Sequence, residues 1–314
     1  MCKSNLRAML VAEIKCKLCF MLAVKLLSFG SLAALMGSPA ASQVVISEPV
    51  SSTVVVNDDV DVTIAPTGAV RVTDPGGGGV AIFGDYSSTF SNEGAISSES
   101  SGGLFGINTA NGVLILGDVL AGGKIINDGS VSVTADSSVV AGATAYLISG
   151  DLSGSLFNSG EISASANSGS NADAFGVFSG DLSGSLFNSG EISASANSGF
   201  RADAVGVFVS GKTQGDLTNE GIVSATASAP NVANASGVLI GDMQGEFSNT
   251  GVITASASGA GTSNAYGLYF ENFDGVITDV GQISASADNG DAYAIFLGSG
   301  NGTLNLRSTD QVQG

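Results

Sequence analysis

The sequence predicts an all-β protein, a right-handed parallel β-helix (β-solenoid) of about eight coils, with about 30 residues and three short strands per coil. Three observations support this prediction. Residues 150–169 recur unchanged as residues 180–199. Tripeptides of the form N-x-G return every 30 to 35 residues. Between them, apolar and polar residues alternate in short runs, which is typical of strands with one buried face.

The exact repeat argues for stacked coils. In an ordinary globular core each buried position meets different neighbours, so a verbatim copy would meet unsuitable ones. In a solenoid the neighbour of one coil is another coil with the same requirements. Antiparallel hairpins, as in a propeller or a sandwich, are the alternative, but a propeller blade needs four strands, and 30 residues is short for one. Right-handed winding is expected because parallel crossovers are almost always right-handed.

The N-x-G tripeptides mark the same corner of successive coils. The column comprises Asn92, Asn127, Asn158, Asn188, Asn219, Asn249 and, in the related TDVG, Asp279. Each lies two positions after an apolar residue, so it points inward with that residue. We predict a structural ladder, in which each amide donates to one neighbour and accepts from the other. A ligand site is the alternative interpretation.

The unit around Asn158 illustrates the three strands. Its apolar runs cover residues 155–158, 161–166 and 172–179, separated by turns rich in Gly, Ser and Asn. In the second run, residues 162, 164 and 166 (Ile, Ala, Ala) point to one face of the strand, and residues 161, 163 and 165 (Glu, Ser, Ser) point to the other. The same pattern recurs in the following units. The outward Ser and Thr residues would form a hydroxyl array along the sheet.

Residues 1–42 resemble an export signal, which we expect to be helical and cleaved after Ala40 or Ser42. A basic start precedes an apolar run over residues 18–37, which Lys25 interrupts. The uninterrupted part is too short to span a membrane. Residues 43–314 would then form a single solenoid repeat domain. All three cysteines lie in the first 19 residues, so the processed protein would contain none.

Charge disfavours several classes of partner. The chain carries a formal charge of −18, but residues 1–42 hold five basic residues and one acidic residue. The remainder has five basic and 27 acidic residues, a net charge of −22. Nucleic acid and anionic membrane surfaces are therefore unsuitable partners. The dispersed acidic surface suits a protein kept soluble outside a cell.

The residue types for most catalysis are missing. The sequence has no histidine, which excludes Ser-His-Asp triads and His metal ligands. We therefore expect no catalytic residues, no cofactor and no metal site. Oxygen-ligated Ca²⁺ would require convergent carboxylates. The acids at Gly-Asp turns, which we expect to be turn residues forming one rough column, are Asp85, Asp118, Asp151, Asp181, Asp216 and Asp242.

Repeats such as FNSGEISASA, LTNEGIVSATA and FSNTGVITASA, behind a long basic leader, resemble the passenger region of bacterial autotransporters. The resemblance covers roughly residues 44–310 and rests on low-complexity motifs. It implies a β-helix exported by a Gram-negative bacterium to its outer membrane and cell surface, or released there. Passengers are often adhesins. The end of this sequence, NLRSTDQVQG, departs from the family, so we expect a passenger-like chain without the C-terminal translocator barrel.

These observations predict an exported, non-catalytic structural or adhesive protein at the cell surface or in the extracellular medium. Its partner would be a host or matrix protein or a glycan. Two alternatives stay open. A carbohydrate-active β-helix enzyme would need clustered carboxylates with Arg or Lys. An ice- or mineral-binding protein would use the outward Ser and Thr array.

Overall fold

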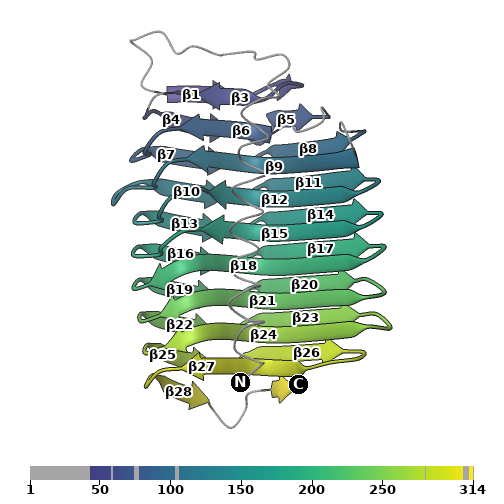
Figure 1. Ribbon diagram of the computed structural model, residues 1–314. Helices are drawn as coiled ribbons and strands as arrows, with labels where there is room; N and C mark the ends of the chain where they lie inside the picture. The colour runs from purple at the N-terminus through teal and green to yellow at the C-terminus, as the bar shows by residue number, and fades with distance from the viewer. Residues whose placement is uncertain are drawn as a thin grey trace.

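The computed structural model describes residues 43–57, 59–73, 78–102, 106–279, 281–306 and 311–313. The predicted signal peptide, residues 1–42, lies outside this part of the chain. The described residues form three parallel sheets wound into one solenoid (Figure 1). The predicted fold class is therefore confirmed. Within these ranges there is no helix of the length and apolar character needed to cross a membrane.

Sheet A contains the short strands that end at the N-x-G corner. In stacking order its strands are β1 (Gln43–Ile46), β4 (Asp61–Ile64), β7 (Thr89–Asn92), β10 (Lys124–Asn127), β13 (Ser155–Asn158), β16 (Ser185–Asn188), β19 (Asp216–Asn219), β22 (Glu246–Asn249), β25 (Val276–Asp279) and β28 (Thr303–Leu306). After β7, β10, β13, β16, β19 and β22, a tight turn at the N-x-G glycine leads to sheet B.

Sheet B holds the second run of each coil. Its strands are β2 (Pro49–Val50), β5 (Ala69–Val72), β8 (Ala95–Ser101), β11 (Ser130–Ser137), β14 (Glu161–Ser168), β17 (Glu191–Ser198), β20 (Ile222–Ser228), β23 (Val252–Ser258), β26 (Gln282–Ala287) and β29 (Gln311–Gln313). In each full-length repeat the positions equivalent to residues 162, 164 and 166 face the interior, and the Ser and Thr residues face outward.

Sheet C contains the longest strands. They are β3 (Val54–Val56), β6 (Gly78–Phe83), β9 (Ile107–Leu116), β12 (Val140–Ile148), β15 (Asn171–Ser179), β18 (Arg201–Thr213), β21 (Val232–Met243), β24 (Thr262–Phe273) and β27 (Ala292–Ser299). The eight coils predicted from the tripeptides run from β4 to β27. The short strands β1–β3 and β28–β29 extend the stack at its two ends.

Equivalent residues of neighbouring coils pair directly. The verbatim repeat places Leu156 opposite Leu186 and Ile162 opposite Ile192. Every strand of one sheet meets its counterpart in the next coil in parallel register. A duplicated coil therefore meets its own complement, as the sequence predicts.

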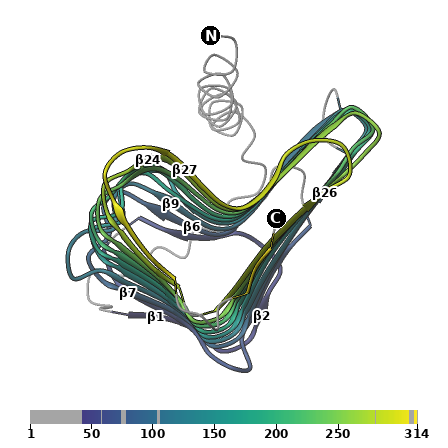
Figure 2. The ribbon, with the colours of Figure 1, turned by 90° about the horizontal axis from the view of Figure 1, so that it is seen from below.

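One continuous hydrophobic core fills the space between the sheets. Ile162 of sheet B, Leu156 of sheet A and Val177 of sheet C all belong to it and are fully buried. Where sheets B and C meet, the core is lined mainly by alanine, as at Ala166 and Ala172. These small side chains allow the two sheets to form a thin arm that projects from the cross-section (Figure 2).

Sheet C bends where the arm begins, so that its outer side is concave (Figure 2). The pairing of β15 with β18 runs up to Phe175 opposite Val205 and resumes at Val177 opposite Val207, which leaves Gly176 at the break. A Cβ atom on Gly176 would lie 2.6 Å from Cγ2 of Ile192 in sheet B. Glycine thus permits the bend because the two sheets approach closely there.

Glycine is also required at the N-x-G corner, for a different reason. A Cβ atom on Gly190 would overlap the backbone carbonyl oxygen of Gly160 in the preceding coil. The same overlap would occur at the equivalent glycines of the other coils, such as Gly221 and Gly251. The corner backbones stack so closely that the column admits no side chain.

The substitution Gly190→Ala should therefore destabilise the protein by about 1–3 kcal/mol, the usual cost of forcing atoms into a packed site. Gly78→Ala is the matched control, because its Cβ would only reach the Asn111 carbonyl oxygen at 3.8 Å. We expect the control to be neutral or slightly stabilising. Urea unfolding followed by circular dichroism measures both, and equal stabilities would contradict the close approach.

Candidate functional site

The predicted column of amides lies inside the corner between sheets A and B, and all seven members are fully buried or nearly so. Each Asn donates from Nδ2 to the Oδ1 atom of its equivalent in the next coil, over 2.7 to 2.8 Å. The structure brings together Asn92, Asn127, Asn158, Asn188, Asn219, Asn249 and Asp279.

In the five asparagines from Asn92 to Asn219, the amide Nδ2 also has a backbone acceptor. In Asn188, Nδ2 lies 2.8 Å from Asn219 Oδ1 and 3.1 Å from the Ile222 carbonyl oxygen. Buried amides are therefore hydrogen-bonded to the protein itself, which removes the cost of their burial. This arrangement fits the structural interpretation of the column, because the amides face one another inside the corner.

The ladder has a direction, which explains its last member. Every donor points toward the C-terminal end, so the final residue needs only to accept. Asp279 accepts from Asn249 through Oδ1, and its counterpart in β28 is the apolar residue Leu306. An asparagine at position 279 would have no side-chain acceptor in the next coil. At the other end Asn92 pairs with Ile64, and the Asn92 Oδ1 atom has no hydrogen-bond partner.

The column of turn acids differs from the prediction at one position. The carboxylates of Asp118 and Asp151 each accept the backbone N–H of the next coil, over 2.8 Å in both cases. Asp181 does the same for Lys212, which occupies the place predicted for Asp216. Asp216 instead begins β19 in sheet A. The prediction was wrong because this coil carries a lysine at the turn position, and the next acid along the chain, Asp216, already pairs with Ser185 in sheet A.

These acids act on the backbone of the neighbouring coil, as turn residues do. Within the described ranges, no three His, Cys, Asp or Glu side chains come together in a group able to hold a metal ion.

A second surface is more unusual, namely the concave outer face of sheet C (Figure 2). It carries three parallel columns of side chains. The polar column is Asp173, Asp203, Asn234 and Asn264. The middle column is Thr144, Phe175, Val205, Ser236, Tyr266 and Tyr293. The apolar column is Leu114, Leu147, Phe178, Phe208, Leu239, Tyr269 and Phe296.

The apolar side chains of this face form a hydrophobic cluster separate from the core. Phe178 and Phe208 meet edge to face with ring centroids 4.9 Å apart, and Phe175 packs against both. Aromatic pairs in such geometries contribute beyond the area that they bury. A continuous apolar stripe, aromatic in β15 and β18 and aliphatic at Leu239 in β21, therefore runs along the outside of the solenoid, where solvated polar residues would be expected.

The stripe continues to the C-terminal coils and becomes accessible there. Tyr266 stacks on Tyr293, with rings 9° from parallel, and Tyr269 stacks on Phe296 at 10°. Tyr293 is 41% exposed. Contiguous exposed apolar patches, unlike single exposed residues, mark interaction sites on soluble proteins.

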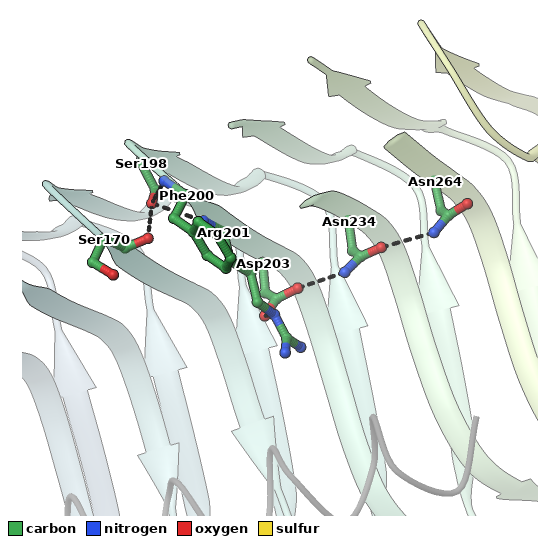
Figure 3. Close-up of polar contacts among 7 residues, drawn as sticks. All are labelled: Ser170, Ser198, Phe200, Arg201, Asp203, Asn234 and Asn264. Atoms are coloured by element: carbon green, nitrogen blue, oxygen red, sulfur yellow. Dashed lines mark hydrogen bonds and ion pairs between the residues drawn. The ribbon is translucent and has the colours of Figure 1, made fainter. Parts of the chain in front are cut away.

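Beside the stripe, the polar column forms a second hydrogen-bonded ladder (Figure 3). Asn264 Nδ2 donates to Asn234 Oδ1 over 3.0 Å, and Asn234 Nδ2 donates to Asp203 Oδ1 over 2.8 Å. The other oxygen of Asp203 receives Nε of Arg201, also over 2.8 Å. This ladder also ends on a carboxylate, because its donors all point toward the N-terminal end.

The tip of the arm adjoins this ladder. In β17 the Ser198 hydroxyl contacts the Ser170 carbonyl oxygen and accepts the backbone N–H groups of Phe200 and Arg201, over 3.1 Å each. These contacts fix the turn from which Arg201 reaches Asp203 (Figure 3). Phe200 projects from the tip with 54% of its surface exposed.

Burial shifts the ionisation of two tyrosines in the core rather than of this face. Desolvation raises the pKa of Tyr146, whose hydroxyl has no hydrogen-bond partner. Desolvation also raises the pKa of Tyr86, with further contributions from the charges of Asp61 and Asp59. Both tyrosines are packing residues and lie away from the outer face of sheet C.

Sequence reasoning did not identify the outer face of sheet C. Alternation predicts a buried side only for the second run of each coil and makes no prediction for the third run, in which Ala172 and Ala174 line the core. The available signal was the second set of apolar residues in the same run, which includes Phe175 and Phe178. A strand apolar on both sides indicates that both sides are covered.

The substitution Asn188→Asp tests the Asn ladder. An aspartate accepts from Asn158 but cannot donate to Asn219, and its charge would be buried without a partner. We expect a loss of about 3–5 kcal/mol near neutral pH. Asn305→Asp, at an exposed position of β28, is the control and should cost little.

The pH dependence gives a second readout. Burial would raise the pKa of the new carboxyl above its unfolded value of about 3.9. The penalty is then present above that folded pKa and disappears as the pH falls to the unfolded value, where the protonated group can donate. The stability gap to the parent protein should narrow on acidification. A gap that is independent of pH would contradict a buried, donor-dependent ladder.

Comparisons with known proteins assign no relative. No family model matches the chain, no curated protein matches it, and no solved structure matches it. The architecture is therefore assigned from the structure alone, as a parallel β-solenoid of about eight coils with an apolar stripe on the outer face of sheet C.

Proposed function

We propose that this protein is an exported, non-catalytic adhesive β-solenoid, displayed at a Gram-negative cell surface or secreted, which binds its partner through the outer face of sheet C. The observation that carries the proposal is the apolar stripe with its adjoining polar ladder. The partner class is a host or matrix protein or a glycan. The resemblance of the repeats to autotransporter passengers supports the same placement.

The chemistry of the outer face of sheet C suits recognition. Tyrosine, phenylalanine and arginine are enriched where proteins bind one another, and charged residues are depleted at the centre of such surfaces. Here Tyr266, Tyr269 and Phe296 supply rigid area, and Arg201 with Asn234 supplies directional polar groups at the edge. The outer face of sheet B differs, because Ser and Thr dominate it.

Binding is favoured over catalysis by the state of the acidic groups. A glycosidase needs one carboxyl group to donate a proton and a second to attack or to activate water. Asp203 is committed to Arg201 and Asn234, so it holds a ladder in place rather than facing a substrate. The sequence also contains no histidine to act as a general base.

Export is supported by the distribution of charge along the sequence. Residues 1–42 combine basic residues with an apolar run, and the remainder carries a net charge of −22. A strongly acidic, repetitive body remains soluble and monomeric through self-repulsion.

The double substitution Tyr266→Ser/Tyr269→Ser tests the proposed binding face. Protein recovered from the medium or cell surface of an expressing Gram-negative host is assayed on immobilised matrix proteins and glycans. We expect saturable binding to at least one of them, weakened at least tenfold by the double substitution, since aromatic anchors dominate such interfaces.

The control is Ser224→Ala/Thr226→Ala, which alters the outer face of sheet B in a neighbouring coil. It should bind like the parent protein. Loss of binding in this control, with binding retained in the tyrosine variant, would show that the partner binds the Ser and Thr array of sheet B and not sheet C. Absence of binding to the whole panel, or retention in the cytoplasm, would contradict the proposal.

A further inference from the structure

The hydrophobic core is open at the end of the stack beyond β27. Sheets A and B continue there by one more strand each, β28 and β29, whereas β27 is the last of the described strands of sheet C (Figure 1). One edge of β27 pairs with β24 in parallel, and none of the described strands pairs with its other edge. Among the described residues, the outermost coil therefore has strands in sheets A and B but none in sheet C.

The inward side chains of this outermost coil are exposed as a consequence. Leu304 of β28 is 40% exposed and Val312 of β29 is 39% exposed, whereas their counterparts in the preceding coil, Ile277 and Ile283, are fully buried. Leu304 and Val312 line an apolar hollow of about 560 Å³ together with residues of β27, Ile295 among them. Contiguous apolar surface of this kind marks a place of interaction.

A complete coil shows which group would cover the hollow. Phe247 of β22 and Phe270 of β24 point inward from sheets A and C of one coil, and their ring centroids are 5.8 Å apart. Leu304 occupies the place of Phe247 in the outermost coil, two strands further along sheet A. A strand at the corresponding level of sheet C would therefore bring its inward side chains against Leu304.

We propose that this end of the solenoid is a second binding site, at which an extended, uncharged segment of a partner protein adds to sheet C as a strand parallel to β27. Strand addition to an exposed sheet edge is a recurrent mode of recognition, in which main-chain hydrogen bonds give affinity and alternate side chains give specificity. The inference goes beyond the proposed function, because it concerns the edge of sheet C and the hollow rather than the outer face.

The sequence of this end favours an uncharged segment. Residues 292–306 contain no Asp, Glu, Lys or Arg, although residues 43–314 carry a net charge of −22. Edge strands of soluble proteins usually carry a charged residue or a proline that prevents further pairing. The edge strand β27, with the sequence AYAIFLGS, has neither. A charged side chain entering the hollow would lose its hydration without gaining a partner.

A second copy of the chain is a poorer occupant, for a steric reason. Strands β28 and β29 stand one strand spacing, about 4.8 Å, beyond β27. They would meet the other copy first and hold it away from the edge of β27. A single extended segment can enter between β28 and β29 and reach that edge.

A synthetic peptide tests the site. It has the sequence of residues 262–270, TSNAYGLYF, which is uncharged and forms the strand that already pairs with β27 on its other edge. The peptide carries a dye on a Gly-Ser linker and is titrated into the full-length protein, with fluorescence anisotropy as the readout. The control peptide has Asp in place of Leu268 and Phe270, both inward and fully buried in the solenoid.

We expect saturable binding of the parent peptide, at least tenfold tighter than that of the control peptide, because the inward side chains enter the apolar hollow. Absence of saturable binding, or equal affinity of the two peptides, would overturn the inference. Size-exclusion chromatography covers the alternative occupant. A dimer that dissociates when the peptide is added would identify a second copy at this edge and would overturn the inference as well.

Substitutions in the protein locate the binding. Leu304→Asn/Val312→Asn changes the hollow and should weaken binding of the parent peptide at least tenfold. The matched control is Val139→Asn/Ile222→Asn, because both residues are 44% exposed and lie away from this end. Circular dichroism checks that each variant retains its β-structure. Parent-like binding by the first variant, or equal weakening in the control, would contradict the proposed site.

Disulfide trapping tests the direction of the added strand. With the three native cysteines changed to Ser, Ala292→Cys or Leu297→Cys is combined with a peptide that has Cys in place of Ala265. Ala265 lies opposite Ala292 in the pairing of β24 with β27, so a parallel strand in the same register should crosslink at residue 292 at least tenfold more than at residue 297. Equal or reversed yields would overturn the parallel arrangement. All these variants keep Tyr266 and Tyr269, so the binding proposed for the outer face succeeds or fails separately.

Discussion

In-register pairing of each coil with the next is the constraint on which the rest of the structure depends. Parallel ladders join all the strands of a sheet, so each side chain has its equivalent of the next coil as its nearest neighbour, about 4.8 Å away. A residue is tolerated only if it can stand beside a copy of itself. Small, apolar and amide side chains meet this condition, and buried carboxylates do not.

The two hydrogen-bonded columns show how side chains meet that condition within a ladder and how each ladder terminates. Inside the corner the donors point toward the C-terminal end and stop at Asp279. On sheet C the donors point the opposite way and stop at Asp203. An amide column needs a terminal residue that accepts without donating, and aspartate provides it. The position of the carboxylate thus records the direction of each ladder.

Much of the fold could be predicted from the sequence because equivalent positions of successive repeats are the residues that pair between strands. The alignment of Asn158 with Asn188 fixes the register of all three sheets, and alternation in residues 161–166 fixes which side is buried.

The outer face of sheet C could not be predicted in this way. Its residues vary from coil to coil, as Phe175, Val205, Ser236 and Tyr266 show, so no repeated letter marks the column. The bend at Gly176, which makes that face concave, depends on contact with a different sheet. Lys212 was missed among the turn acids because it has the same backbone role without the same side chain.

Disulfide formation between neighbouring coils tests the in-register stack most directly. With the three native cysteines changed to Ser, the pair Ala164→Cys/Ala194→Cys joins positions that face each other in β14 and β17. Their expected Cα separation of about 4.8 Å suits a disulfide, whereas the diagonal pair Ala164→Cys/Ala196→Cys would be about 7–8 Å apart. Rapid oxidation of the first pair and little of the second is the predicted result. Equal oxidation of both pairs, or failure of the first in folded protein, would contradict the stack.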